Sequence, residues 1–284
     1  MKFFISLLLP LISLPVFSRL WGRIVRLRHP RFLVKRVIKR YQRAYNISMD
    51  EYEGKVEDYR SLADFFTRRL DPGKRPLVPQ ENAVVSPADG ILTEVETIYS
   101  DQATQVKGKT YKISQLLHET IDFSLGWHVA VIYLAPSNYH RYHYPISGNI
   151  ERYFHSSGRL YPVNRLGVNR VNRLFVRNER IITEIVNRQM SCYMAAIGAS
   201  FVGGIKMEFI PGSLRKKRDQ WVPMNREVQQ LEEMGRFEMG STIVLVIPAS
   251  MAEPMHKIIG QPIKVGQPIF KMLSFWGLDK QKTP

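Results

Sequence analysis

The pattern of hydrophobic and polar positions begins with an apolar segment followed by a basic one. Residues 3–17 are almost wholly apolar, carry no charge, and contain Pro10 and Pro15. A straight helix of that length reaches only about 22 Å, short of the roughly 30 Å hydrocarbon core of a bilayer, and the prolines disfavour a straight span further. Residues 19–43 then hold ten Lys or Arg and no Asp or Glu, with apolar residues between them at helical spacing. The pattern predicts that residues 1–46 form a membrane anchor and basic amphipathic helices.

A secretory signal peptide is the alternative for the apolar segment, because Lys2 precedes it. However, Phe17, Ser18 and Arg19 do not form a small-residue cleavage site, and the basic block follows at once. Positive residues beside an apolar stretch favour a cytoplasmic location for that flank. We therefore expect an uncleaved anchor that dips into the inner leaflet of the cell inner membrane from the cytoplasmic side, as a peripheral or monotopic protein.

Two further zones follow the basic segment. Residues 47–82 read as a helical connecting region, with Ser61 as a candidate N-cap and a stop at Asp71-Pro72-Gly73. From residue 83 onward, short β-rich runs are broken by Gly and Pro. The predicted fold class is α+β, with a mainly-β domain over residues 83–284 behind N-terminal membrane-associated helices.

Charge and cysteine content narrow the function classes. The net charge of +16 calls for an anionic partner, either nucleic acid or a membrane surface. Because no nucleic-acid-binding motif accompanies the basic residues, an anionic membrane surface is the expected partner, with RNA as the alternative. The single cysteine, Cys192, lies in an apolar run and excludes an internal disulfide framework or a multi-cysteine metal site.

Three local features could carry chemistry. Asp89 lies in a Ser-Pro-Ala-Asp-Gly turn at the start of a predicted strand, which alone is an ordinary turn signal. His140 and His143 follow the apolar run at 128–134 and could supply acid–base groups, whereas no third ligand at suitable spacing suggests a metal site. Gly240-Ser241 precedes an apolar strand, and glycine there permits backbone geometry barred to other residues and exposes its carbonyl.

A hydrolase triad is one interpretation of these residues. Asp89, His143 and Ser241 could assemble as Asp, His and Ser, since a triad is defined by geometry and not by sequence order. The sequence has no G-x-S-x-G nucleophile elbow, and Ser241 follows a single glycine that leads directly into a strand. A Ser-His-Asp lipid hydrolase therefore remains only the alternative.

A series of short motifs follows in order along the chain from about Tyr59 to the C-terminal region. They are 64–70 (DFFTRRL), 73–76 (GKRP), 86–90 (SPADG), 134–136 (LAP), 139–141 (YHR), 143–145 (HYP), Gly148, 161–164 (YPVN), 174–175 (LF), 178–180 (NER), 233–237 (EMGRF) and 240–242 (GST). In combination, these motifs resemble the phosphatidylserine decarboxylase family. The family's cleavage motif usually has Leu before Gly-Ser-Thr, where this chain has Met239, and Asn138 stands where Asp is frequent.

The resemblance implies a self-processing proenzyme. Ser241 would attack the carbonyl of Gly240, with His143, oriented by Asp89, as the base. The chain would separate into residues 1–240 and 241–284, and Ser241 would become a covalent pyruvoyl cofactor that serves as an electron sink in decarboxylation of phosphatidylserine to phosphatidylethanolamine. His140 is expected to act in the decarboxylation cycle, and no metal is expected.

The resemblance also bears on fold and assembly. Residues 86–95 and 259–270 look like half-motifs of the biotinyl/lipoyl barrel-sandwich, so barrel-sandwich-like elements are expected in the β domain. A homodimer of cleaved protomers is the family expectation. The non-enzyme alternative is a non-catalytic basic homologue that binds membrane or RNA.

Overall fold

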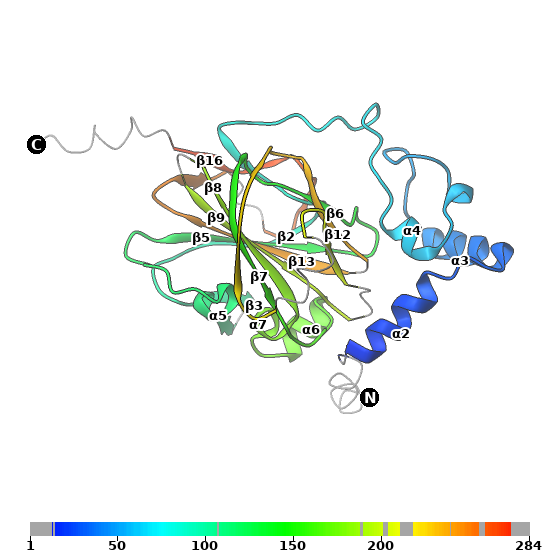
Figure 1. Ribbon diagram of the computed structural model, residues 1–284, viewed down its shortest axis with the longest axis horizontal. Coiled ribbons are helices and arrows are strands. Elements are labelled where there is room, and N and C mark those ends of the chain that lie inside the picture. Colours follow the sequence, from blue (N-terminus) through cyan, green and yellow to red (C-terminus); the bar gives the residue numbers. More distant parts are fainter. Residues whose placement is uncertain are drawn as a thin grey trace, which may run out of the picture.

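The computed structural model describes residues 13, 15–106, 108–187, 190–200, 204–210, 218–238, 240–255 and 259–273. Most of the predicted apolar anchor, and Met239 beside the predicted cleavage bond, lie outside the described residues. The described part is mainly β, with short helices around the sheets and a group of helices at one side (Figure 1).

An open eight-stranded sheet forms the centre of the β domain. All of its paired neighbours run antiparallel. Its strands, in spatial order, are β11 (Trp221–Val228), β7 (Gly148–Ser156), β8 (Arg180–Val186), β9 (Ser191–Ile197), β13 (Ser241–Pro248), β5 (Trp127–Leu134), β2 (Gly90–Ile98) and β15 (Pro262–Ile263).

Smaller sheets and short helices flank this sheet. The sheets are β1 (Ala83–Val85) with β16 (Pro268–Met272) and β14 (Ala252–Pro254), β10 (Ile205–Met207) with β12 (Glu233–Phe237) and β6 (Arg141–His143), and β3 (Ala103–Val106) with β4 (Lys109–Tyr111). The short helices beside the large sheet are α5 (Ile113–Leu117), α6 (Arg165–Arg170) and α7 (Leu174–Arg177).

The large sheet is buried on both faces, and the sequence of β13 shows why. Its residues Thr242 to Ile247 form an unbroken β-branched and apolar run, which suits a strand covered on both sides. Ile243 and Leu245 pack into one hydrophobic cluster, whereas Val244 and Val246 pack into a second cluster on the other face. β13 is therefore covered by hydrophobic side chains on both faces of the sheet.

The two segments expected to be half-motifs of a barrel-sandwich pair with one another. The Ser86 N–H donates to the Gln267 carbonyl at 2.7 Å, and β2 pairs with β15 at Ile91↔Pro262. The strands then continue into open sheets, and the described strands form no closed barrel. The likeness to a barrel-sandwich is thus limited to this pairing.

The N-terminal helices pack as a group against one end of the β domain (Figure 1). They are α2 (Pro15–Val25), α3 (Arg31–Ala44), the 3₁₀ helix η1 (Val56–Asp58) and α4 (Leu62–Phe66). Ile38 of α3 is fully buried in a small cluster with Phe65 of α4. No helix among the described residues is both long and apolar enough to cross a bilayer.

The predicted start of the connecting helix is confirmed, and its predicted end is wrong. The hydroxyl of Ser61 accepts a hydrogen bond from the Asp64 N–H at 3.1 Å, as an N-cap does. Helix α4 nevertheless ends at Phe66, before the Asp71-Pro72-Gly73 turn. The chain leaves the helix early because Leu70 forms a β-bridge with Tyr52.

Candidate functional site

Ser241 is the first residue of the central strand β13, where its backbone pairs with Leu134 of β5. The side chain is fully buried, and its Oγ has no hydrogen-bond partner among the described residues. Leaving a buried hydroxyl unpaired costs about 1–3 kcal/mol. Such an unsatisfied group calls for an explanation, and a role in chemistry is one that a serine hydroxyl can fill. The hydroxyl of Ser241 is thus committed to no structural contact.

Gly240 precedes this strand and is half-buried. Its φ lies outside the left-handed region, and a Cβ added to it would meet no atom within 4 Å. The expectation that glycine supplies a backbone geometry barred to other residues is therefore not met in this structure. The observed property is open space beside the Gly240–Ser241 bond.

His140 lies in the loop that leads into β6 and is fully buried. Its Nδ1–H donates to the Asn138 carbonyl at 2.8 Å, and the Phe66 ring lies 3.9 Å from the imidazole, centroid to centroid. The other ring nitrogen, Nε2, has no partner among the described residues. Burial lowers the pKa of His140 to about 3. The hydrogen bond to Asn138 acts in the opposite direction, and the positive charge of Arg68 lowers the pKa further. At neutral pH the ring is uncharged and presents a free lone pair on Nε2.

The buried guanidinium of Arg68 fixes the loop that holds His140. It donates to the carbonyls of Ser137 at 2.6 Å and Asn138 at 3.2 Å, and it lies 4.2 Å from the Tyr52 ring centroid. The Asn138 carbonyl therefore accepts from both Arg68 and His140, which orients the imidazole and selects its tautomer.

His143 lies at the end of β6 and has both ring nitrogens occupied. Nδ1–H donates to the Leu231 carbonyl at 2.7 Å, so Nε2 accepts from the Tyr139 hydroxyl at 3.0 Å. Burial lowers the pKa of His143, partly offset by the Leu231 hydrogen bond and by the negative charges of Glu233 and Asp89. The imidazole can accept a proton at Nε2 only when the Tyr139 hydroxyl moves away.

Asp89 is not in contact with His143, contrary to the sequence-based expectation. Its carboxylate instead binds the guanidinium of Arg75 through two hydrogen bonds of 2.8 and 2.6 Å, and its Oδ1 also accepts from the Val265 N–H at 2.9 Å. A planar guanidinium offers a carboxylate two charge-assisted hydrogen bonds, which a neutral imidazole cannot match. Asp89 therefore acts on His143 through space, by raising its pKa.

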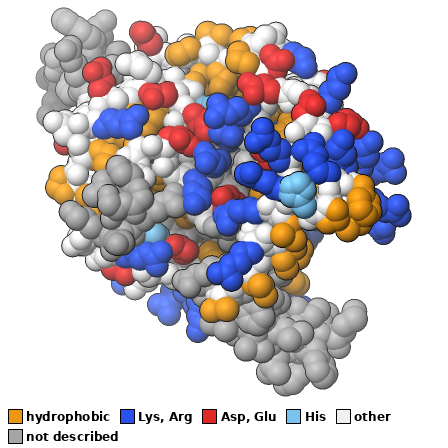
Figure 2. Space-filling model, turned by 45° about the vertical axis from the view of Figure 1, so that its right-hand side comes forward, with side chains coloured by type: hydrophobic (Ala, Val, Ile, Leu, Met, Phe, Trp, Pro, Cys, Tyr) orange, Lys and Arg blue, Asp and Glu red, His pale blue; other side chains and the backbone are white. Residues whose placement is uncertain are grey.

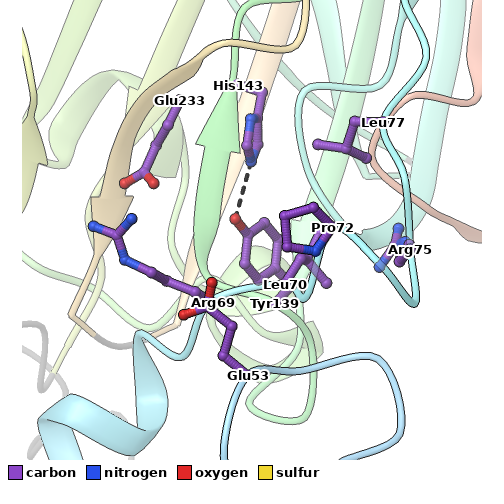
Figure 3. Close-up of a pocket in the computed structure, with 9 residues that line it drawn as sticks. All are labelled: Glu53, Arg69, Leu70, Pro72, Arg75, Leu77, Tyr139, His143 and Glu233. Carbon is purple, nitrogen blue, oxygen red and sulfur yellow. Dashed lines mark hydrogen bonds between the residues drawn. The ribbon is translucent and has the colours of Figure 1, made fainter.

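A cavity of about 310 Å³ opens beside His143. In Figure 3 the His143 ring lies above Tyr139, Arg75 and Leu77 line one side, and the side chains of Arg69 and Glu233 point toward each other on the opposite side. Ser241 and His140 are not among the residues that line it. The structure thus places His143 beside this cavity and leaves Ser241 and His140 enclosed.

His128 lies within β5 and has both ring nitrogens hydrogen-bonded, to the Thr97 hydroxyl and the Ala252 carbonyl, so its role is structural. Within the described ranges, no three His, Cys, Asp or Glu side chains group closely enough to hold a metal ion.

Comparison of the sequence with known proteins places the chain in a family. A family model described as phosphatidylserine decarboxylase matches residues 62–271. A protein of Brevibacillus brevis named phosphatidylserine decarboxylase proenzyme is 35% identical over 244 residues, which cover 83% of this chain and 86% of the relative. Proteins of the same name from Anaeromyxobacter and Hahella chejuensis are each 32% identical, over 89% and 94% of this chain and 92% and 93% of their own lengths. The chain belongs to the phosphatidylserine decarboxylase family.

Sequence reasoning missed three residues that shape the site of this phosphatidylserine decarboxylase family member. Arg68 positions the loop of His140, Arg75 forms the ion pair with Asp89, and the Tyr139 hydroxyl hydrogen-bonds to Nε2 of His143. All three lie within segments that resemble the family, and that likeness was the available signal. Their partners could not be read from the sequence because the contacts depend on tertiary packing.

The N-terminal helices also reach the cleavage region of this family member. The guanidinium of Arg26, the residue after α2, forms an ion pair with Glu238, two residues before Gly240. The helix group is thus joined to the segment that precedes the predicted scissile bond.

Proposed function

We propose that this protein is a phosphatidylserine decarboxylase made as a proenzyme, which cuts itself between Gly240 and Ser241. The single observation that carries the proposal is the buried, unpaired hydroxyl of Ser241 directly after Gly240, in a chain whose family match spans residues 62–271. The relatives carry the name phosphatidylserine decarboxylase proenzyme, which supports both the reaction and the self-processing.

Self-processing begins with attack of Ser241 Oγ on the Gly240 carbonyl. The attack converts the peptide bond to an ester, and elimination then frees the Gly240 carboxylate. The dehydroalanine left at position 241 takes up water and loses ammonia, which yields a pyruvoyl group. The absence of competing hydrogen bonds at Oγ and the open space at Gly240 both support this step.

His143 is the proposed base for processing, with Asp89 supporting it. A carboxylate that favours the protonated ring assists proton uptake, and Asp89 has that influence on His143. For His143 to act, its Nε2 must exchange the Tyr139 hydroxyl for the serine proton, so a side-chain rearrangement precedes cleavage. The rate of self-cleavage is therefore expected to depend on this exchange.

His140 is the proposed proton-transfer group of the decarboxylation cycle. The pyruvoyl carbonyl supplies an electron sink for the loss of carbon dioxide. His140 presents an unpaired Nε2 on a ring held by Asn138 and Phe66. A neutral ring with one free nitrogen can accept and return a proton without reorienting.

The N-terminal helices are proposed to bind the cytoplasmic face of the inner membrane. Lys and Arg side chains gather on the side of the molecule that carries the helices, with hydrophobic side chains next to them (Figure 2). Apolar residues on helices bearing Lys and Arg suit an anionic bilayer surface. The exposed apolar residues are Val16, Leu20, Ile24, Leu27, Phe32, Leu33 and Val37. A homodimer remains a prediction from the family resemblance.

No observation favours the hydrolase alternative. A hydrolase uses its Ser-His-Asp triad in every turnover, so its members are hydrogen-bonded in the resting enzyme. Here Ser241 Oγ is unpaired, both nitrogens of His143 have other partners, and Asp89 is held by Arg75. Self-cleavage takes place once in each chain, so its residues need not be hydrogen-bonded to one another beforehand, and this geometry is compatible with it.

Intact mass spectrometry of the purified protein beside its Ser241→Ala variant tests the proposal. We expect the wild type to give two chains, residues 1–240 and 241–284, the second lacking a free amino terminus. The variant should stay a single chain. A wild-type chain of full mass under native conditions would remove the basis for decarboxylation.

A further inference from the structure

The chain that leads into Ser241 determines how the Gly240 carbonyl is presented to the hydroxyl. Ser241 begins β13 and pairs with Leu134 of β5, so the strand fixes the chain after this residue. Rotation about the N–Cα bond of Ser241 sets the distance between its Oγ and the Gly240 carbonyl carbon, and the same rotation swings the preceding residues. Gly240 has no side chain to restrain this rotation, and a Cβ there would meet no atom within 4 Å. The orientation of the carbonyl therefore depends on what holds the chain before Gly240.

Two contacts hold the chain just before this bond. Phe237 is the last residue of β12, and its N–H donates to the His140 carbonyl at 2.8 Å. Glu238 follows, and its side chain is 13% exposed. Among the described residues, the carboxylate of Glu238 has one partner, the guanidinium of Arg26. A carboxylate largely withdrawn from water depends on such a cation, so Arg26 keeps Glu238 in place.

Arg26 extends the face of α2 that packs against the rest of the protein. Gly22 and Val25 are buried, and Arg26 lies four residues after Gly22, on the same side of the helix. Leu20 and Ile24 lie on the opposite side and are exposed. Arg26 and its partner are 212 positions apart in the sequence, so their contact requires α2 to be docked on the β domain.

We propose that Arg26 is a positioning residue for self-cleavage: it holds Glu238 and thereby orients the Gly240 carbonyl toward Ser241 Oγ. The inference rests on the proposed function and adds that cutting depends on the N-terminal helices, because a chain whose α2 is not docked lacks the contact. A displacement of about 1 Å at a reacting atom can slow a reaction roughly 100-fold, whereas a partly exposed ion pair contributes little to the stability of a whole protein. Loss of Arg26 should therefore affect the rate of cutting far more than the fold.

The rate of self-cleavage tests this role. Cell-free synthesis supplies the uncut chain, mass spectrometry follows its cleavage with time, and neutral detergent micelles keep anionic lipid away from the basic helices. Arg26→Gln and Glu238→Gln should each slow cleavage about tenfold, and the double variant should be no slower than either, since all three remove one contact. Arg23→Gln is the matched control, because Arg23 is exposed in the last turn of α2 and its loss removes the same charge; its rate should equal that of the wild type.

Thermal unfolding of the same variants, each with Ser241→Ala so that all stay uncut, separates positioning from folding. Unfolding midpoints within about 3 °C of the parent chain are expected. A much larger fall would make the role of the ion pair structural and would overturn the proposal, as would additive slowing in the double variant. Cleavage of Arg26→Gln at the wild-type rate refutes the positioning role alone, whereas a wild-type chain that stays uncut refutes the proposed function as well.

Discussion

The buried ring of His140 should make the fold sensitive to mild acid. An unfolded histidine titrates near pH 6.5, whereas the folded ring titrates at about 3. The unfolded chain therefore binds one more proton than the folded chain between these values, and the free energy of unfolding falls as the pH falls from about 6.5 to about 3. At pH 4.5 the difference spans two pH units, or about 2.7 kcal/mol at 1.36 kcal/mol per unit.

Replacing His140 with phenylalanine isolates this contribution. Phenylalanine preserves a ring beside Phe66 but cannot titrate. Urea unfolding at pH 7 and pH 4.5, with Ser241→Ala in both chains to keep them uncut, gives the loss of stability for each. His118, His128 and His143, whose pKa values burial also lowers, contribute equally to both chains and cancel.

We expect the chain with His140 to lose about 2–3 kcal/mol more between the two pH values than the His140→Phe chain. The same loss in both chains would show that the ring is protonated in the folded protein at pH 4.5. The burial of His140, and with it the neutral base proposed for decarboxylation, would then be wrong.

Three further predictions concern the other site residues. Arg75→Met should lower the free energy of unfolding by about 3–5 kcal/mol, because Asp89 loses its buried partner; urea unfolding should show most of the loss recovered by adding Asp89→Leu, and no recovery would contradict the pairing. Gly240→Ala should change stability by less than about 0.5 kcal/mol, since its Cβ enters open space; a larger loss in thermal unfolding would mean that this space is filled. Tyr139→Phe should raise the pKa of His143, because it removes a hydrogen bond to the neutral ring; an unchanged or lower value in an NMR titration would refute this.

Local patterns predicted much of the fold. The unbroken apolar run after Ser241 specified a buried strand, and the Ser61 hydroxyl was identifiable as a cap because the cap and the Asp64 N–H that donates to it lie three residues apart. The end of α4 was mispredicted because the competing contact, between Tyr52 and Leu70, is tertiary. Interactions that close over a few residues are readable from a sequence, and those that depend on packing are not.

The same distinction applies to the candidate site. Asp89, His140, His143 and Ser241 stand out as residue types that carry acid–base and nucleophilic chemistry. Their pairing could not be derived, because His140 and His143 lie three residues apart yet have different environments. One is enclosed with a free nitrogen, whereas the other borders a cavity with none. Burial and partner, not residue type, separate their roles.

The central position of β13 determines what a cut at Gly240 can do to the molecule. β13 pairs with β5 on one side and β9 on the other, and β16 of the same fragment is held between β1 and β14. The smaller fragment would thus supply an interior strand of its partner's core, so the two pieces would share one folding transition and have no separate folded forms. Dilution of the folded mature enzyme should not separate the two fragments. Maturation would change the connectivity of the polypeptide while its architecture stays as it was, and a denatured mature enzyme, having lost the continuous chain that brought β13 between its neighbours, would refold as a concentration-dependent association of two pieces.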